Sequence, residues 1–146
     1  MMGRPDIVAA TREWIGTPYL HQASLQGVGT DCLGLLRGVW RSVVGHEPQC
    51  VPAYTMDWSE ACGTEEMLAA AFRWLVNKPL AEVALGDVIV FRMRSGFVAK
   101  HVGIVSATGP EPRFIHAYTG HGVVENALTQ PWARRIAGRF AFPTGA

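Results

Sequence analysis

Hydrophobic residues recur at helical spacing in three segments of the chain. In residues 32–44 the apolar positions are separated by steps of three and four, which predicts an amphipathic helix. The same spacing predicts a first helix over residues 5–15, starting at Pro5 or Asp6. A third helix is expected over residues 64–75, because a threonine and acidic residues precede its apolar positions. Each helix is expected to pack one apolar face on a core.

Shorter apolar segments have the composition of β-strands, because they are rich in β-branched residues and bounded by turn residues. They occupy residues 86–91, 100–105, 113–118, 122–125 and 138–142. Glycine and proline at 108–112 suit a hairpin between the second and third strands. Neither a repeat nor a low-complexity linker divides the sequence, so residues 1–146 are expected to form a single domain.

The composition excludes several classes of protein. Of the 146 residues, 49% are hydrophobic, and the net charge is +1, which suits one globular core. The basic residues cluster no further than short local pairs such as Arg134-Arg135, so no nucleic acid is expected as a partner. The apolar runs are too short to cross a bilayer, and the N-terminus lacks the apolar core and cleavage site of a signal peptide. We therefore expect synthesis in the cytoplasm, with neither a signal peptide nor membrane insertion.

Cys32 lies where a turn of glycine and polar residues leads into the predicted helix 32–44. Thr30 or Asp31 can cap this helix, and a thiol in its first turn faces unpaired N–H groups and the positive end of the helix dipole. Both features favour the thiolate. Free cysteines are more often simply buried, however, and the carboxylate of Asp31 would raise the pKa of the thiol. A catalytic role therefore requires a base and a group that orients it.

Two histidines lie on neighbouring predicted strands. If strands 100–105 and 113–118 form a hairpin, His116 is expected opposite or nearly opposite His101, with Gly103 near Phe114. The two imidazoles would then share a hydrogen bond, through which His116 could fix the tautomer and ring plane of His101. A slip of one residue would move one histidine to the other face.

The remaining histidines and cysteines have weaker indications of a role. His21 could line the cleft, but an exposed loop histidine without a role is an equal alternative. His46 follows the C-terminus of the helix 32–44 and His121 lies in a turn, so both are interpreted as structural. No spacing typical of metal ligands occurs, so neither a metal nor an organic cofactor is expected. Cys50 and Cys62 are expected to be free thiols.

Short motifs surround these residues in a characteristic order. They are Gly16-Thr17-Pro18-Tyr19, Asp31-Cys32-Leu33-Gly34-Leu35, Gly86-Asp87, His101-Val102-Gly103-Ile104 and Phe114-Ile115-His116-Ala117. In this order and spacing, the chain resembles the NlpC family of bacterial cell-wall cysteine peptidases from about residue 14 to residue 118. The resemblance implies a papain-like α+β fold, in which N-terminal helices, including the nucleophile helix, pack on a central antiparallel sheet of about five strands.

The resemblance also implies an activity and the residues that perform it. Cys32 would be the nucleophile, His101 the base that holds it as a thiolate, and His116 the orienting group. The substrate would be a peptidoglycan stem peptide, cleaved at a bond of the D-glutamyl-diaminopimelate type.

The substrate groove is assigned to residues near the nucleophile. Tyr19 matches the tyrosine that lines the groove in the family, although a tyrosine in a turn can also be packed with only its hydroxyl at the surface. Asp31 and His21 are placed in the same substrate-binding region.

Two departures from the common family pattern indicate a particular subgroup of the family. Leu33 follows the cysteine where many members have serine, and Leu20-His21-Gln22-Ala23-Ser24 replaces a glycine pair after the tyrosine. With His21-Gln22-Ala23-Ser24 and Gly27-Val28-Gly29 before Asp31-Cys32-Leu33-Gly34-Leu35, the chain resembles the subgroup encoded with phage tails and gene transfer agents. That resemblance implies local opening of the cell wall for DNA delivery. The subgroup implies tail-tip or hub proteins as partners, and transport in a particle would bring the enzyme to the wall without a signal peptide.

Two other functions remain open. The protein could be a structural tail-tip component, in which Trp58 and Trp132 serve an interface. It could also be a thiol amidase or acyltransferase acting on a related bond, because such an enzyme uses the same nucleophile and base.

Overall fold

The fold is that of a computed structural model, which describes residues 3–48, 66–92 and 99–143. Its helices are α1 (Pro5–Arg12), α2 (Cys32–Val43), α4 (Glu66–Trp74) and α5 (Gln130–Ala133). Its strands are β1 (Ser24–Leu25), β2 (Gly29–Thr30), β3 (Val76–Lys78), β4 (Val88–Arg92), β5 (Ala99–Ala107), β6 (Arg113–Tyr118), β7 (Gly122–Ala127) and β8 (Ile136–Ala141). The three helices and five strands expected from the sequence are all present, with ends that differ by a few residues.

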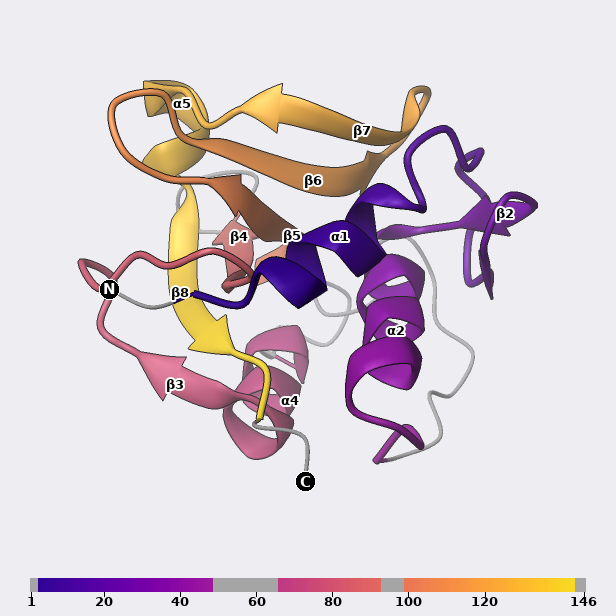
Figure 1. Cartoon of the computed structure of the whole chain (residues 1–146), viewed down its shortest axis with the longest axis horizontal. Helices are drawn as coiled ribbons and strands as arrows, with labels where there is room; N and C mark the ends of the chain where they lie inside the picture. The colour runs from indigo at the N-terminus through magenta and orange to yellow at the C-terminus, as the bar shows by residue number, and fades with distance from the viewer. Residues whose placement is uncertain (1–2, 49–65, 93–98, 144–146) are drawn as a thin grey trace.

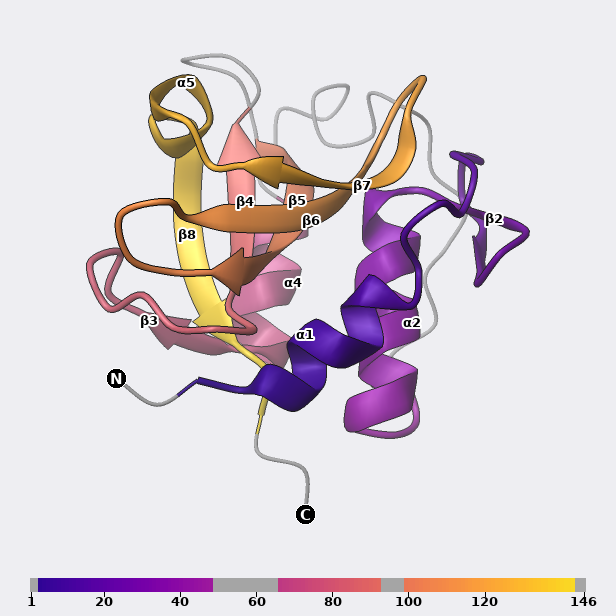
Figure 2. The same ribbon diagram turned by 45° about the horizontal axis from the view of Figure 1, so that its top comes forward.

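The central sheet is antiparallel and has six strands in the order β3-β8-β4-β5-β6-β7. About five strands were expected, and the additional one is β3, which pairs with β8 at the edge of the sheet. Its three residues include Asn77 and Lys78, so it lacks the apolar alternation that predicts a strand. In both ribbon views α1 and α2 lie side by side next to the sheet (Figures 1 and 2).

Both faces of the sheet are covered. On one face α1, α2 and α4 pack on the sheet and bury a large cluster that includes Val88, Val90 and Val102. On the other face, Ile89 and Phe91 belong to a smaller cluster that also contacts the α5 segment. Because neighbouring residues of β4 are buried on opposite faces, this strand appears in the sequence as a continuous apolar run rather than as an alternating one.

A buried carboxylate joins three strands next to the Gly86-Asp87 turn. The side chain of Asp87, which is 3% exposed, forms ion pairs of 2.7 Å with Lys78 Nζ and 2.9 Å with Arg139 Nη1. It also accepts a hydrogen bond from the backbone N–H of Ala84, and Arg139 Nε donates to the carbonyl of Leu80. These bonds compensate the carboxylate for the water that it loses on folding. Asp87 therefore holds β3 and β8 against the start of β4.

Candidate active site

Asp31 caps the helix that begins with Cys32. Its Oδ1 accepts a hydrogen bond of 2.7 Å from the backbone N–H of Gly34, and its Oδ2 accepts another of 2.7 Å from the N–H of Gln22. Of the two capping residues considered, Thr30 and Asp31, the second is the N-cap. The same carboxylate therefore holds the first turn of α2 and the loop that precedes β1.

Gly34 is required by the close approach of this loop to α2. A Cβ at position 34 would lie 1.9 Å from the carbonyl oxygen of Ala23 and 2.6 Å from Oγ1 of Thr30. Because the nearest of these atoms belongs to the backbone, the loop itself would have to move. The glycine two residues after the cysteine thus allows the loop to lie beside the start of α2.

A side chain at position 34 is expected to destabilise the protein. Gly34→Ala should lower the free energy of unfolding by about 1–3 kcal/mol, as overpacking does elsewhere, and chemical denaturation measures this change. Ser42→Ala, at an exposed position of the same helix, is the matched control and should change little. A Gly34→Ala protein as stable as the wild type would contradict the close approach.

The thiol of Cys32 lies against the strand that carries His101. Sγ donates to the carbonyl oxygen of Lys100 at 3.8 Å, and the backbone N–H of Val102 bonds to the same sulfur. These two backbone groups flank His101 on β5, so the sulfur lies beside the histidine that was proposed as its base.

The Cys32 thiol is protonated at rest. Burial, with the negative charge of Asp31, raises the pKa of Cys32 to about 12. The N–H groups of Val102, Leu33 and Cys32 itself oppose this shift without overcoming it. The N–H groups at the helix start favour the thiolate and Asp31 opposes it, both as expected from the sequence, and the net pKa is raised because the loss of solvent is the largest effect.

His101 and His116 are hydrogen-bonded to each other. The distance from His101 Nε2 to His116 Nδ1 is 2.8 Å, and the two rings meet edge to face at 78°. His116 is fully buried and His101 is 7% exposed. Burial lowers the pKa of both, that of His101 to about 3 with a contribution from His116, so both rings are neutral at pH 7.

The register between the two histidine strands differs from the predicted one by two residues. Ile104 pairs with Ile115, and extending this register by one pair places His116 against Gly103 rather than His101. An even shift keeps both histidines on one face, where they meet diagonally.

Gly103 leaves the space in which this contact forms. A Cβ at Gly103 would lie 2.8 Å from the ring of Phe114 and 3.4 Å from Cβ of His116. The expectation that Gly103 lies near Phe114 is confirmed, and the small residue admits protein side chains at this position.

Aromatic rings enclose the histidine pair. The centroid of Trp132 lies 5.1 Å from that of His116 and 5.9 Å from that of His101. Trp132, suggested by the sequence as an interface residue, is half-buried and packs on these two rings. Trp58, the other tryptophan suggested, lies outside the described residues, as do Cys50 and Cys62.

Asn126 is a site residue that the sequence did not reveal. Its Oδ1 lies 2.7 Å from His116 Nε2, on the side of the ring away from His101. The strand β7 was expected to end at residue 125, but it continues to Ala127 and places Asn126 opposite Phe114. Val124 pairs with His116, and Asn126 lies two residues further along β7, on the same face of the sheet. A polar residue at that position was the only feature of the sequence that could have indicated this contact.

Tyr19 and His21 both lie near the start of α2. Burial raises the pKa of the Tyr19 phenol, and the nearby Cys32 and Asp31 raise it further. A hydrogen bond with Thr119 lowers this pKa but does not offset the rise. His21 Nδ1 lies 3.8 Å from Asp31 Oδ2. The three residues assigned to the substrate groove therefore lie near one another at the start of α2. Both carboxylate oxygens of Asp31 already accept hydrogen bonds from backbone N–H groups, so its observed role is to cap the helix.

Of the other two histidines, His121 lies close enough to His116 to lower the pKa of that ring, whereas His46 lies beyond the end of α2. The exposed ring of His121 stacks on Tyr118 at 5.4 Å, and His46 is exposed beyond α2, where its carbonyl accepts a bond from Trp40 Nε1. In the described ranges, no three His, Cys, Asp or Glu side chains are grouped so as to hold a metal ion. None of the described helices is long and apolar enough to span a bilayer.

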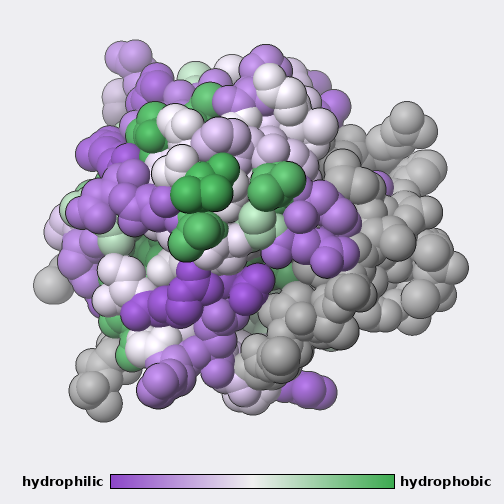
Figure 3. Space-filling model, turned by 90° about the vertical axis from the view of Figure 1, so that its right-hand side faces the viewer, coloured by the Kyte–Doolittle hydropathy of each residue, from purple (hydrophilic) through white to green (hydrophobic). Residues whose placement is uncertain are grey.

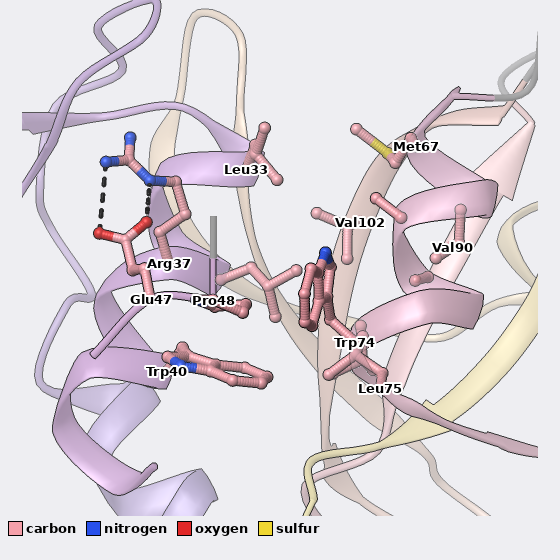
Figure 4. A pocket seen from close by; sticks show the side chains of 14 residues that line it. Leu33, Arg37, Trp40, Glu47, Pro48, Met67, Trp74, Leu75, Val90 and Val102 are labelled. Atoms are coloured by element: carbon pink, nitrogen blue, oxygen red, sulfur yellow. Dashed lines mark hydrogen bonds and ion pairs between the residues drawn. The ribbon is translucent and has the colours of Figure 1, made fainter. Parts of the chain in front are cut away.

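An apolar cavity of about 120 Å³ separates α2 from α4 (Figure 4). Trp40 and Trp74 lie on its walls, and the ion pair between Arg37 and Glu47, 2.6 Å long, lies beside it. Val102 also lines it, and the side chain of this residue points away from the face that carries His101. Among the described residues that line the cavity, the charged ones are Arg37 and Glu47, which pair with each other, and Val102 separates the cavity from the face that carries the histidine pair.

Comparisons with known proteins identify similar sequences and folds. A model of the NlpC/P60 family matches residues 16–139. No curated protein sequence matches the chain. Among solved structures, the NlpC/P60 domain of the peptidoglycan hydrolase SagA has a TM-score of 0.62 at 23% identity, with 95% of this chain and 99% of that chain covered.

Two longer bacterial proteins share the same fold. An NlpC/P60 family protein of Bacillus cereus has a TM-score of 0.64 at 20% identity, with 99% of this chain and 41% of that chain covered. A lipoprotein-like protein of the NLP/P60 family from Staphylococcus aureus has a TM-score of 0.60 at 18% identity, with 100% and 44% covered. The chain thus spans less than half the length of these two proteins. The likeness confirms the expected papain-like α+β fold.

Proposed function

Because this chain belongs to the NlpC/P60 family, we propose that it is a cysteine peptidase of the peptidoglycan hydrolase type, with Cys32, His101 and His116 as its reacting and orienting groups. One observation carries this proposal. The sulfur of Cys32 bonds to the backbone on either side of His101 on β5, and Nε2 of that ring is bonded to His116. The similar fold of a domain from the peptidoglycan hydrolase SagA supports the substrate class.

The mechanism follows from the protonation states at rest. His101 Nε2 is engaged by His116, which leaves Nδ1 as the nitrogen that can act on the thiol. As the sulfur attacks the scissile carbonyl carbon, the S–H proton passes to Nδ1 and an oxyanion forms. Collapse breaks the C–N bond, and Nδ1 returns the proton to the leaving amine. Water, deprotonated by the same nitrogen, then hydrolyses the thioester and regenerates the thiol.

The developing oxyanion requires hydrogen-bond donors near the sulfur. We assign this role to the backbone N–H of Cys32, which lies in the first turn of α2 and adds the positive end of the helix dipole. The hydroxyl of Tyr19 is the second candidate, because the phenol lies close enough to Cys32 for the two groups to affect each other's charge. Both donors belong to the segment that Asp31 holds in place.

The proposed substrate is the stem peptide of peptidoglycan, cleaved between D-glutamate and a diamino acid. Digestion of purified sacculi, followed by mass spectrometry of the released fragments, tests this proposal. Wild-type protein should release D-glutamyl-diaminopimelate cleavage products, and Cys32→Ala should release none. Equal release by the variant would overturn the assignment of the nucleophile. Cleavage between glycan and peptide would instead identify an amidase.

We further propose that the protein acts at the tail tip of a phage-like particle. The residues that resemble the tail-associated subgroup lie next to Leu20, Leu25 and Val28, which are 54%, 60% and 61% exposed. Figure 3 views this side of the molecule and shows apolar side chains gathered among hydrophilic ones. A neighbouring tail or hub protein would cover them.

Purification of particles from producing cells tests the tail location. Wild-type protein should be found in the particle fraction by mass spectrometry, and Leu25→Asp should reduce its amount there. A protein that is absent from purified particles would contradict this location. An inactive protein that is firmly bound in them would instead favour the structural alternative.

The activity is expected to persist at mildly acidic pH. The thiol proton is accepted by neutral His101, whose pKa is lowered to about 3, and burial also lowers the pKa of its partner His116. Both rings therefore stay neutral below the pH at which an ordinary histidine becomes charged. A histidine with an ordinary pKa near 6.5 would be only about 3% neutral at pH 5. Initial rates on a soluble muropeptide from pH 4 to pH 9 measure this. A loss of kcat/KM centred near pH 6.5 would contradict the prediction.

A further inference from the structure

The hydrogen bonds of the two histidines form a chain that ends at an amide. Asn126 Oδ1 lies 2.7 Å from His116 Nε2, and His116 Nδ1 lies 2.8 Å from His101 Nε2. The three members come from three neighbouring strands: Asn126 from β7, His116 from β6 and His101 from β5. Cys32, at the start of α2, bonds to the backbone on either side of His101. Only the Asn126 end of the histidine chain lies at an exposed position.

The position of each proton follows from the acceptor at the end of this chain. An amide oxygen can only accept, so Nε2 of His116 must carry a hydrogen. Burial keeps His116 neutral, so its Nδ1 has a lone pair and accepts the N–H of His101 Nε2. His101, also neutral, then has its own lone pair on Nδ1. This is the nitrogen that the proposed reaction needs.

The opposite orientation of the chain would block the reaction. If position 126 donated to His116 Nε2, both rings would take the other tautomer, and Nδ1 of His101 would already carry a hydrogen. The same result follows if His116 becomes charged, because an imidazolium donates from both nitrogens. An acceptor that does not itself ionise is therefore the most suitable group at position 126.

We propose that Asn126 is a positioning residue that sets the tautomer of His101 through His116. This inference rests on the proposed function, since it concerns the base of that reaction. Asn126 acts at a distance from the substrate, and its effect reaches the sulfur through two rings. The titratable groups that face His116 are His101, Tyr118 and His121, and an uncharged amide adds no further charge to them.

Two substitutions at position 126 separate this role from a structural one. Asn126→Leu removes the acceptor and keeps a similar side-chain size. It should lower kcat by about tenfold at every pH. This is less than the roughly 10⁴-fold loss that follows when the base is entirely in the wrong tautomer, because part of His101 would still be in the active tautomer. Asn126→Asp keeps an acceptor but adds a negative charge, which favours charged His116. Its activity should approach that of the wild type at pH 9 and fall at mildly acidic pH, where the wild type stays active. Asn77→Leu, on the opposite edge strand, is the control and should match the wild type.

The tautomers can also be measured without activity. In a Cys32→Ala background, ¹⁵N NMR of the histidine rings should show hydrogen on Nε2 and a lone pair on Nδ1 for both His101 and His116. Asn126→Leu should introduce the other tautomer into both rings. Unchanged ring shifts together with unchanged kcat in Asn126→Leu would overturn the inference. If the wild type fails to cleave peptidoglycan, the proposed function fails, and the NMR experiment still decides the role of Asn126.

Discussion

Replacing His101 with alanine is expected to lower kcat by about 10⁴-fold or more, the usual cost of removing the base of a nucleophilic pair. The reason is specific to this site. The pKa of Cys32 is raised to about 12, so almost no thiolate exists at neutral pH without a base to take the proton. Turnover of a soluble muropeptide measures the effect, and KM should change much less.

Control variants separate this loss from a loss of fold. His101→Gln keeps more of the side-chain volume and should be equally inactive, while thermal denaturation reports whether either variant is folded. His46→Ala removes an exposed imidazole beyond α2 and should retain full activity. A folded His101 variant within tenfold of wild-type kcat would show that another group is the base.

Replacing Asp87 with alanine is expected to lower the free energy of unfolding by about 3–5 kcal/mol, the cost of removing one partner from a buried ion pair. The side chain of Arg139 is 4% exposed, and in the variant its positive charge would stay buried without the Asp87 carboxylate that now pairs with it. Lys78 and the N–H of Ala84 would lose the same acceptor. Urea denaturation followed by circular dichroism measures the change.

An exposed aspartate provides the comparison for Asp87. Asp6 pairs with Arg4 at 2.9 Å, but its side chain is 55% exposed, and surface pairs of this kind contribute little to stability. Asp6→Ala should therefore be close to the wild type. Equal losses for the two variants would show that the burial of Asp87 does not decide its contribution.

The sequence predicted the elements and the meeting of the histidines because both follow from local patterns. Apolar spacing locates α2, and the strand period of two places His101 and His116 on one face of the sheet. The exact register depends on an irregularity in β5 between Val105 and Ala107. It depends equally on the length of the turn between Ala107 and Arg113. Neither feature leaves a periodic pattern in the residues, and the register expected by counting from the turn is two residues out.

The features that were missed are short or depend on contacts made only in the folded chain. The strand β3 and the helix α5 have three and four residues, too few for a periodic signal. The bond between Asn126 and His116 requires two strands in register. The raised pKa of Cys32 depends on how much water the folded chain excludes, whereas the helix start, visible in the sequence, indicated the opposite direction.

The Asp31 carboxylate has a consequence for the chemical durability of Cys32. Peroxides and disulfides react with thiolates far faster than with thiols. By raising the pKa of the thiol to about 12 together with burial, the cap that anchors α2 also keeps the sulfur in its less oxidisable form. We therefore expect the sulfur to resist oxidation at rest, and in the proposed reaction it would react only when a bound carbonyl and His101 act on it together.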